Sequence, residues 1–131
     1  MSNNILYIED NPDNMMLVRR ILQTGDYNLM EARSGLQGLS LVESHSVDLI
    51  LLDINLPDID GYEVARRLRA NDKIAEAHTP IIVLTANAMR GDAEKALEAG
   101  CDLYMSKPIN IFELLEKINT LMHKGARGNI L

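Results

Sequence analysis

The sequence predicts an α/β domain in which five parallel strands form one open sheet and five helices cover its two faces. The clearest indication is the run from Leu49 to Leu52, which is entirely aliphatic and ends at Asp53. A run without polar alternation is typical of a strand that is buried on both faces of a parallel sheet. The second indication is that such runs alternate along the chain with segments of helical periodicity, and right-handed crossovers place these helices on both faces.

The first half of the chain follows this alternation. Ile5 to Ile8 form an apolar run, and Asn11 and Pro12 then provide an N-cap and a first helical residue. Apolar residues after Pro12 recur on one arc of a helix, which Gly25 closes. The expected elements are a strand at 5–8, a helix from 12 to 23, an outer strand at 27–31, a helix at 35–43 and the central strand within 47–53.

The second half continues the alternation to a final amphipathic helix. Asn110 and Glu113 have the spacing of a capping box, and apolar residues recur at helical spacing after them. The expected elements are a helix at 62–69, a polar connection at 71–79, a buried strand at 80–84, a helix at 92–99, a strand at 101–105 and this last helix. Residues 1–123 therefore form one domain, and 124–131 are expected to be a C-terminal tail or the start of a truncated linker.

The composition fits a single compact domain and excludes several kinds of partner. The chain has 131 residues, a net charge of -6 and no run of five or more basic residues, which argues against binding of nucleic acid through its phosphates. It has no long apolar segment and no cleavable leader, so we expect no association with a membrane. The single Cys101 cannot form an internal disulfide, which fits a cytoplasmic protein.

Polar side chains follow the buried strands at the points where these strands end. The carboxyl ends of parallel strands meet at one edge of a sheet, where ligands bind, so these side chains should share a crevice. Three close carboxylates repel one another, and Mg²⁺ relieves this repulsion while leaving positions open for phosphate oxygens. A lysine and a hydroxyl could hold an anion, so the set indicates phosphoryl transfer. Its members are Glu9, Asp10, Asp53, Thr85 and Lys107.

In their order and spacing, these residues resemble the receiver domains of two-component response regulators. The resemblance covers nearly the whole chain, and it implies a flavodoxin-like fold with strand order 2-1-3-4-5. It also implies that the protein is the phosphoacceptor of a two-component system or phosphorelay. The motifs that carry it are Glu9-Asp10, Asp53 followed by Pro57 and Asp60-Gly61, Thr85-Ala86 and Lys107-Pro108.

The resemblance implies a metal site and an acceptor. Asp53 would accept a phosphoryl group from a phosphohistidine on a histidine kinase or a histidine phosphotransfer protein. Asp10 and Asp53 would bind Mg²⁺ through their side chains, and Asn55 would bind it through its backbone carbonyl. Glu9 would act on the cation through water.

The resemblance also implies a switch. Lys107 would contact a phosphoryl oxygen, and its peptide bond to Pro108 would be cis. Thr85 would move its hydroxyl onto the phosphoryl group, and Tyr104 would rotate inward behind it. This change would shift a population between two existing states of the face formed by the fourth helix, the fifth strand and the fifth helix. That face would bind a downstream protein or a second copy of the chain.

A second surface would receive the partner that carries the phosphohistidine. By resemblance it consists of the first helix and the loop after the last strand. Met16 has polar neighbours on its helical face, which fits a contact that buries a modest area. The expected docking residues are Asn11, Asn14, Met16 and Pro108.

Several readings compete with that of a signalling receiver. The resemblance implies that the chain would catalyse its own phosphorylation and dephosphorylation, at a rate tuned by Asn55 and Asn87, yet would act mainly as a switch. A phosphatase with an aspartyl-phosphate intermediate would need an acid where this chain has Asn55. A degenerate receiver that only binds partners would not need the complete set of site residues. The alternative that stays open is one receiver excised from a hybrid histidine kinase or a multidomain response regulator.

Overall fold

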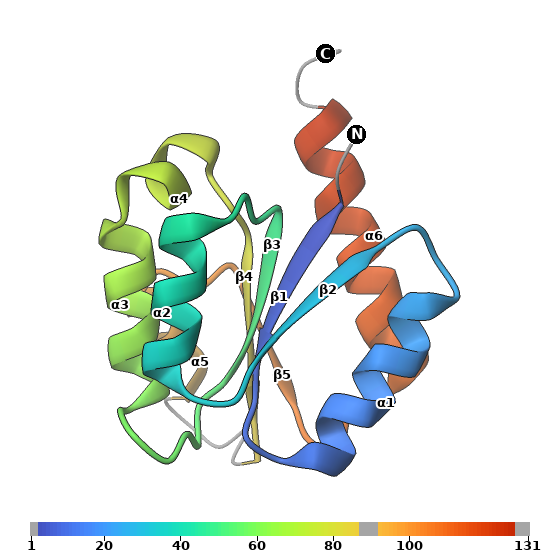
Figure 1. Cartoon of the computed structure of the whole chain (residues 1–131), viewed down its shortest axis with the longest axis horizontal. Coiled ribbons are helices and arrows are strands. Elements are labelled where there is room, and N and C mark those ends of the chain that lie inside the picture. Colours follow the sequence, from blue (N-terminus) through green and yellow to red (C-terminus); the bar gives the residue numbers. More distant parts are fainter. Residues whose placement is uncertain (1–2, 87–91, 128–131) are drawn as a thin grey trace.

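The computed structural model describes residues 3–86 and 92–127 and shows one five-stranded sheet between two layers of helices (Figure 1). The strands lie in the order β2-β1-β3-β4-β5, and every neighbouring pair is parallel. The predicted α/β class and strand order are therefore confirmed. The strands are β1 (Asn4–Ile8), β2 (Asn28–Ala32), β3 (Leu49–Asp53), β4 (Ile81–Thr85) and β5 (Leu103–Ser106).

Six helices belong to the described residues. Helices α1 and α6 cover one face of the sheet, whereas α2, α3 and α5 cover the other (Figure 1). The short α4 follows α3 directly. The helices are α1 (Pro12–Gln23), α2 (Gly35–Ser44), α3 (Gly61–Ala70), α4 (Asp72–Ala77), α5 (Asp92–Glu98) and α6 (Ile111–Arg127).

Alternate residues of the strands enter two separate cores. In β3, Ile50 and Leu52 pack toward α2 and α3, while Leu49 and Leu51 pack toward α1 and α6. All four side chains are fully buried. The central strands are thus apolar on both faces, as the unbroken aliphatic run predicts, and burial of each such side chain contributes about 1.5 to 3 kcal/mol to stability.

The prediction of five helices is wrong by one, because part of the expected polar connection at 71–79 is helical. The side chain of Asn71 accepts hydrogen bonds from the backbone N–H groups of Lys73 (2.9 Å) and Ile74 (3.2 Å), which caps the first turn of α4. Ile74 is 3% exposed and joins the core beside α3. One cap and one buried side chain therefore hold a helix too short to show a periodic pattern in the sequence.

The last helix extends beyond the point where a tail was expected to begin. Helix α6 continues past Lys124 to Arg127, and residues 128–131 lie outside the described part of the chain. The division into a domain at 1–123 and a tail or linker at 124–131 stays a prediction. The start of α6 agrees with the expected capping pattern, because the Asn110 side chain accepts a hydrogen bond from the Glu113 N–H at 3.0 Å.

The chain turns into α1 immediately after the two acidic residues that follow β1. The Asn11 side chain accepts hydrogen bonds from the N–H groups of Asp13 (2.8 Å) and Asn14 (3.0 Å), and Pro12 is the first helical residue. This arrangement is the predicted one. It fixes the first turn of α1 beside the carboxyl edge of the sheet.

The loop after β3 is tied to its surroundings at two points. The carboxylate of Asp58 accepts hydrogen bonds from the backbone N–H groups of Gly35 (2.9 Å) and Leu36 (2.8 Å), at the start of α2. Gly61 donates its N–H to the Ile54 carbonyl at 3.2 Å. A Cβ atom on Gly61 would lie 2.5 Å from Ile54 Cα, so only glycine permits this approach. These contacts fix the course of the chain directly after the end of β3.

Replacement of Gly61 by alanine should therefore destabilise the protein. In Gly61→Ala the new methyl group meets backbone, which must shift, and we expect the free energy of unfolding to fall by about 2 kcal/mol or more. Gly25→Ala is the control, because its Cβ would meet only ring carbons of Tyr27, at 3.2 and 3.3 Å. Urea denaturation measures both variants, and equal losses would contradict the proposed close approach.

Candidate functional site

Three carboxylates gather at the carboxyl edge of the sheet. Glu9 and Asp10 follow β1, and Asp53 is the last residue of the neighbouring β3. One oxygen atom of each lies within 4.8 Å of the others. Glu9 and Asp53 are each 1% exposed, whereas Asp10 is exposed. The structure thus brings together the three acidic residues that the sequence placed in one crevice.

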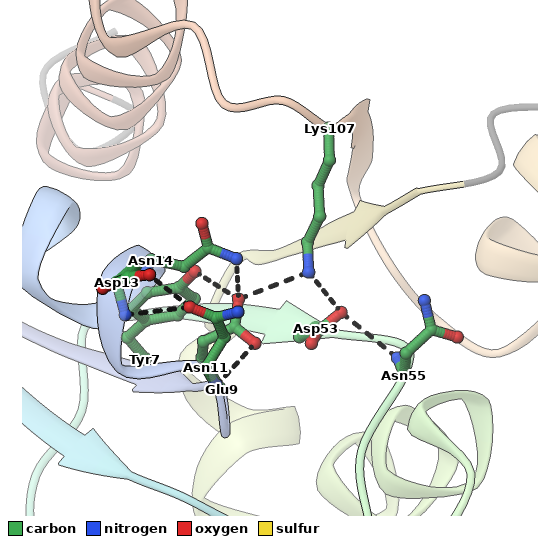
Figure 2. Close-up of polar contacts among 8 residues, drawn as sticks. All are labelled: Tyr7, Glu9, Asn11, Asp13, Asn14, Asp53, Asn55 and Lys107. Atoms are coloured by element: carbon green, nitrogen blue, oxygen red, sulfur yellow. Dashed lines mark hydrogen bonds and ion pairs between the residues drawn. The ribbon is translucent and has the colours of Figure 1, made fainter.

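Lys107 brings a positive charge to the two buried carboxylates. Its Nζ atom lies 3.0 Å from Asp53 Oδ1 and 3.3 Å from Glu9 Oε1, so the ammonium group bridges them (Figure 2). The backbone N–H of Lys107 donates to the Thr85 carbonyl at 2.8 Å, which anchors the lysine at the end of β4. The peptide bond from Lys107 to Pro108 is cis, as predicted.

Glu9 is held by further donors that come from β1 and α1. Tyr7 Oη donates to Glu9 Oε1 at 2.8 Å, and Asn14 Nδ2 donates to the same oxygen at 3.2 Å (Figure 2). The Asn11 N–H makes a longer bond of 3.4 Å to Glu9 Oε2. Tyr7 is not among the predicted site residues, although residues two apart on a strand share a face and Tyr7 precedes Glu9 by two.

The segment after β3 begins with a turn that is closed on the Asp53 side chain. The Asn55 N–H donates to Asp53 Oδ1 at 3.1 Å, and the Asn55 side chain is exposed. Lys107 and this N–H therefore both hold Oδ1 of Asp53 (Figure 2). Oδ1 is fixed by a charge and a backbone group before any ligand arrives.

Burial and mutual repulsion shift the ionisation of the two buried acids in opposite directions. Burial, together with the neighbouring Glu9, raises the pKa of Asp53 to about 7, although Lys107 acts to lower it. Burial would also raise the pKa of Glu9, but the neighbouring Asp53, the hydrogen bond from Tyr7 and the charge of Lys107 bring it below its usual value. Burial would lower the pKa of Lys107, and the two carboxylates raise it instead. The cluster therefore holds more negative charge than its one lysine compensates.

The donor set fits a small, hard divalent cation. Within the described residues, Glu9, Asp10 and Asp53 are the group whose oxygens could hold a metal ion together. Carboxylate oxygens are ligands that Mg²⁺ prefers, and the cation would supply the positive charge that the cluster lacks. Asp10, Asp53 and the backbone carbonyl of Asn55 would be its protein ligands, and Glu9 would act on the cation through water.

Thr85 and Tyr104 lie on the two strands beyond Asp53. Thr85 ends β4 and is 3% exposed, and the register of β4 with β5 pairs it with Ser106, the residue before Lys107. Tyr104 pairs with Val83 and is 37% exposed. The expected switch residues thus occupy neighbouring strands, two positions apart in register.

The expected docking residues lie around the same edge but differ in exposure. Asn11, Met16 and Pro108 are exposed, whereas Asn14 is half-buried, and its side chain is bound to Glu9. Asn14 therefore belongs to the surroundings of the acidic cluster, whatever else it contacts. Besides Met16 and Tyr104, the exposed large hydrophobic residues of the described part of the chain are Leu17 on α1, Leu36 on α2, Leu97 on α5 and Phe112 on α6.

One residue of the predicted machinery falls outside what the structure describes. Asn87, expected to tune hydrolysis, lies outside the described residues.

The fold and the site define a doubly wound α/β domain with an acidic, lysine-bridged cluster at the carboxyl edge of its sheet. The family model of the response regulator receiver domain matches residues 5–119. The chain therefore belongs to the receiver domain family of two-component signalling.

Relatives and solved structures agree with this family. The chain is 38% identical over 122 residues to the polar-differentiation response regulator DivK of Brucella ovis, covering 93% of this chain and 98% of DivK. A CheY-like response regulator receiver domain protein from Methanospirillum hungatei has a TM-score of 0.88 and 28% identity, with 98% and 99% of the two chains covered.

A second solved structure bears on the metal. The receiver domain of the sensor histidine kinase PA1611 from Pseudomonas aeruginosa has a TM-score of 0.84 and 35% identity, with 94% of this chain and 99% of that chain covered. That structure contains a magnesium ion coordinated in its active site cleft.

None of the helices within residues 3–86 and 92–127 is long and apolar enough to span a bilayer.

The uncompensated charge of the cluster predicts that removing one charge stabilises the metal-free protein. The pKa of Asp53 is about 7 in the folded state against an ordinary 3.8, so ionisation of this group lowers stability as the pH rises between these values. At pH 8 in a chelator, Asp53→Asn should raise the free energy of unfolding by about 2 kcal/mol, after allowing for the lost ion pair with Lys107. The gain in stability should vanish below pH 4, where Asp53 is protonated in both the folded and the unfolded state.

Asp58→Asn is the matched control with the opposite sign. Hydrogen bonds from the N–H groups of Leu36 and Gly35 outweigh burial and hold the pKa of Asp58 below its ordinary value, so the charge of this carboxylate stabilises the fold. Its loss should lower the free energy of unfolding by about 0.5 to 1 kcal/mol. Urea denaturation at pH 8 measures both variants, and a loss of stability in Asp53→Asn would contradict the charge argument.

Proposed function

We propose that the chain is a phosphoacceptor receiver, in which Asp53 takes a phosphoryl group from the phosphohistidine of a histidine kinase or a histidine phosphotransfer protein. The observation that carries the proposal is the position of Asp53, which is buried at the end of the central strand with Lys107 Nζ at 3.0 Å and two further carboxylates beside it. This arrangement suits phosphoryl transfer, which depends mostly on positioning and on charge neutralisation.

In the proposed reaction, an oxygen of Asp53 attacks phosphorus in line with the departing imidazole. The Lys107 ammonium and the Asn55 N–H hold Oδ1, so we assign the attack to Oδ2. An oxygen–phosphorus bond forms, the phosphorus–nitrogen bond of the phosphohistidine breaks, and the histidine keeps the electron pair and takes up a proton. Asp10, Asp53 and the Asn55 carbonyl would hold Mg²⁺, and Glu9 would act through water. A cation held there would supply positive charge that offsets the charge on the phosphoryl oxygens.

Lys107 and Thr85 would receive the transferred group. Lys107 would contact one phosphoryl oxygen, and the hydroxyl of Thr85 would bond to another. Tyr104 would then rotate inward and alter the face made of α5, β5 and α6, which correspond to the fourth helix, fifth strand and fifth helix expected from the sequence. The altered face would bind a downstream protein or a second copy of the chain.

The partner that donates the phosphoryl group would dock around α1 and the loop at Pro108. Support comes from the exposure of Met16, which is 45%, and from the positions of Asn11 and Pro108 at the same edge as Asp53. Phe112, at 81% exposure in the first turn of α6, extends the apolar character of this edge.

The net charge of -6 argues against a nucleic acid as the target. We place the protein in the cytoplasm, where these partners act.

The chain would turn over its own acyl phosphate slowly and act as a switch rather than as an enzyme on external substrates. Asn55, two residues after the acceptor, offers no carboxylate to activate water. A second candidate keeps the chemistry but changes the context, since the chain could be one receiver of a hybrid histidine kinase. The likeness to the receiver domain of the sensor histidine kinase PA1611 favours it, whereas the likeness to DivK over 98% of that protein's length favours a separate response regulator.

Incubation with acetyl phosphate and Mg²⁺ tests the acceptor directly. Intact-mass spectrometry should show one added phosphoryl group, and peptide mapping should place it at Asp53. Asp53→Asn should not be labelled, because the amide cannot form the acyl phosphate, and a chelator should abolish labelling of the unchanged chain. Equal labelling of the chain and of Asp53→Asn would refute the assignment.

The docking surface can be separated from the chemistry. Met16→Glu places a charge on the exposed part of α1 and should slow transfer from a phosphohistidine partner about tenfold or more, because a buried unpaired charge weakens the contact. Labelling by acetyl phosphate, which needs no docking, should stay within about twofold of the unchanged chain. Gln23→Glu, an exposed position in the last turn of α1, is the control. Unchanged transfer to Met16→Glu would place the docking surface elsewhere.

A further inference from the structure

Tyr7 is a core residue whose polar end reaches the acidic cluster. Its side chain is fully buried in the core between the sheet and helices α1 and α6, together with Ile5 and Leu51. Its hydroxyl donates to Glu9 Oε1 at 2.8 Å in a buried hydrogen bond. A phenylalanine could fill the same apolar space, so what the hydroxyl adds at this position is its bond to Glu9 (Figure 2).

The donors around Glu9 are distributed unequally between its two oxygens. Oε1 accepts from Tyr7 Oη and from Asn14 Nδ2 and lies 3.3 Å from Lys107 Nζ. Oε2 accepts from the Asn11 N–H at 3.4 Å, which is a weak bond. The carboxylate is therefore fixed through Oε1, and Oε2 is the oxygen that is less tightly held. Because Oε1 is fixed, the plane of the carboxylate and the direction of Oε2 are fixed as well.

Of the three donors on Oε1, Tyr7 has the least freedom to move. Lys107 is shared with Asp53, and in the proposed reaction it turns to a phosphoryl oxygen. Asn14 is half-buried in the first turns of α1, next to the exposed docking residues. Tyr7 has two side-chain torsions and a ring enclosed on every side, so its hydroxyl keeps one position while the other donors respond to ligands.

We propose that Tyr7 is a positioning residue of the cation site, whose buried hydroxyl holds the Glu9 carboxylate beside Asp10 and Asp53 in the orientation that Mg²⁺ binding requires. Tyr7 acts through Glu9 and not on the cation itself. The proposal rests on the proposed function, because it assumes that the three carboxylates bind Mg²⁺. Partners that orient the groups around a metal typically change its affinity by 10- to 100-fold, and for a residue that acts through water we expect the lower end of this range.

Tyr7→Phe removes the hydroxyl and leaves the ring. Titration calorimetry should show Mg²⁺ binding weakened about tenfold. Tyr27→Phe is the matched control, since it also removes a hydroxyl that donates to a side chain, in this case Asn119 Oδ1. Tyr27 precedes β2, which is parallel to β1, so it lies at the amino edge of the sheet, opposite the acidic cluster. Its variant should therefore bind Mg²⁺ within twofold of the unchanged chain. Equal effects of the two variants would overturn the proposal.

A double-variant cycle distinguishes a positioning role from general loosening of the core. If Tyr7 acts through Glu9, Tyr7→Phe should cause less than a twofold further loss of Mg²⁺ affinity in a Glu9→Ala background, which has no acceptor for the Tyr7 hydroxyl. A full tenfold loss in that background would overturn the proposal, because the effect would then bypass Glu9. Tyr27→Phe in the same background gives the size of a purely structural effect.

A measurement on the unchanged chain does not depend on how the variants fold. Carbon-13 NMR of the tyrosine Cζ atoms should show a shift of the Tyr7 signal on addition of Mg²⁺, while the Tyr27 signal stays in place. An unmoved Tyr7 signal would overturn the proposal. Acetyl phosphate labelling separates the role of Tyr7 from the proposed function. If the unchanged chain binds Mg²⁺ and is labelled at Asp53, and Tyr7→Phe binds Mg²⁺ equally well, only the role of Tyr7 is wrong. If the unchanged chain does not bind Mg²⁺, the role of Tyr7 and the proposed function are both wrong.

Discussion

The interaction on which the site depends is the burial of Glu9 and Asp53 side by side around a single lysine. Removing a carboxylate from water is strongly unfavourable unless a charge or several hydrogen bonds compensate it. Lys107 lies 3.0 Å from one carboxylate and 3.3 Å from the other, so one positive charge serves two acids. Glu9 has additional donors, and the uncompensated part of the repulsion therefore falls on Asp53, whose pKa is raised to about 7. The carboxyl group whose ionisation the cluster opposes most is therefore also the proposed acceptor.

The architecture makes this arrangement possible because rigid strands deliver each of its members. β1 and β3 are neighbours, which sets Glu9 and Asp53 side by side, but β5 is separated from β3 by β4. Lys107 spans this gap with its long side chain, while its backbone N–H is anchored on the Thr85 carbonyl at the end of β4. The strands themselves are apolar on both faces, so their positions are set by two packed cores and do not respond readily to charges at the edge.

The strands and the site could be predicted from the sequence because each depends on a local pattern. The aliphatic run before Asp53, the cap at Asn11 and the order of polar strand ends all carry their information within a few residues. What could not be predicted depends on contacts between distant residues or on very short elements. The helix at 72–77 is too short for a periodic pattern, and the bonds of Asp58 to the start of α2 join residues 22 and 23 apart. Tyr7 lies in the predicted strand at 5–8 and is a core residue, but its hydrogen bond to Glu9 can be seen only in the folded chain.

One lysine shared by two carboxylates also couples the chemistry of Asp53 to the rest of the edge. A phosphoryl group adds about one and a half to two negative charges and three acceptor oxygens, so under the proposed function Lys107 would gain partners that compete with Glu9. Glu9 would then depend on Tyr7 and Asn14, which come from β1 and α1, while the backbone of Lys107 stays bound to Thr85. The consequence is a division of the edge into two parts. Under the proposed function, the side at β1 would keep its geometry and hold the cation, whereas the side at β4 and β5, with Thr85 and Tyr104, would move in response to the new charge.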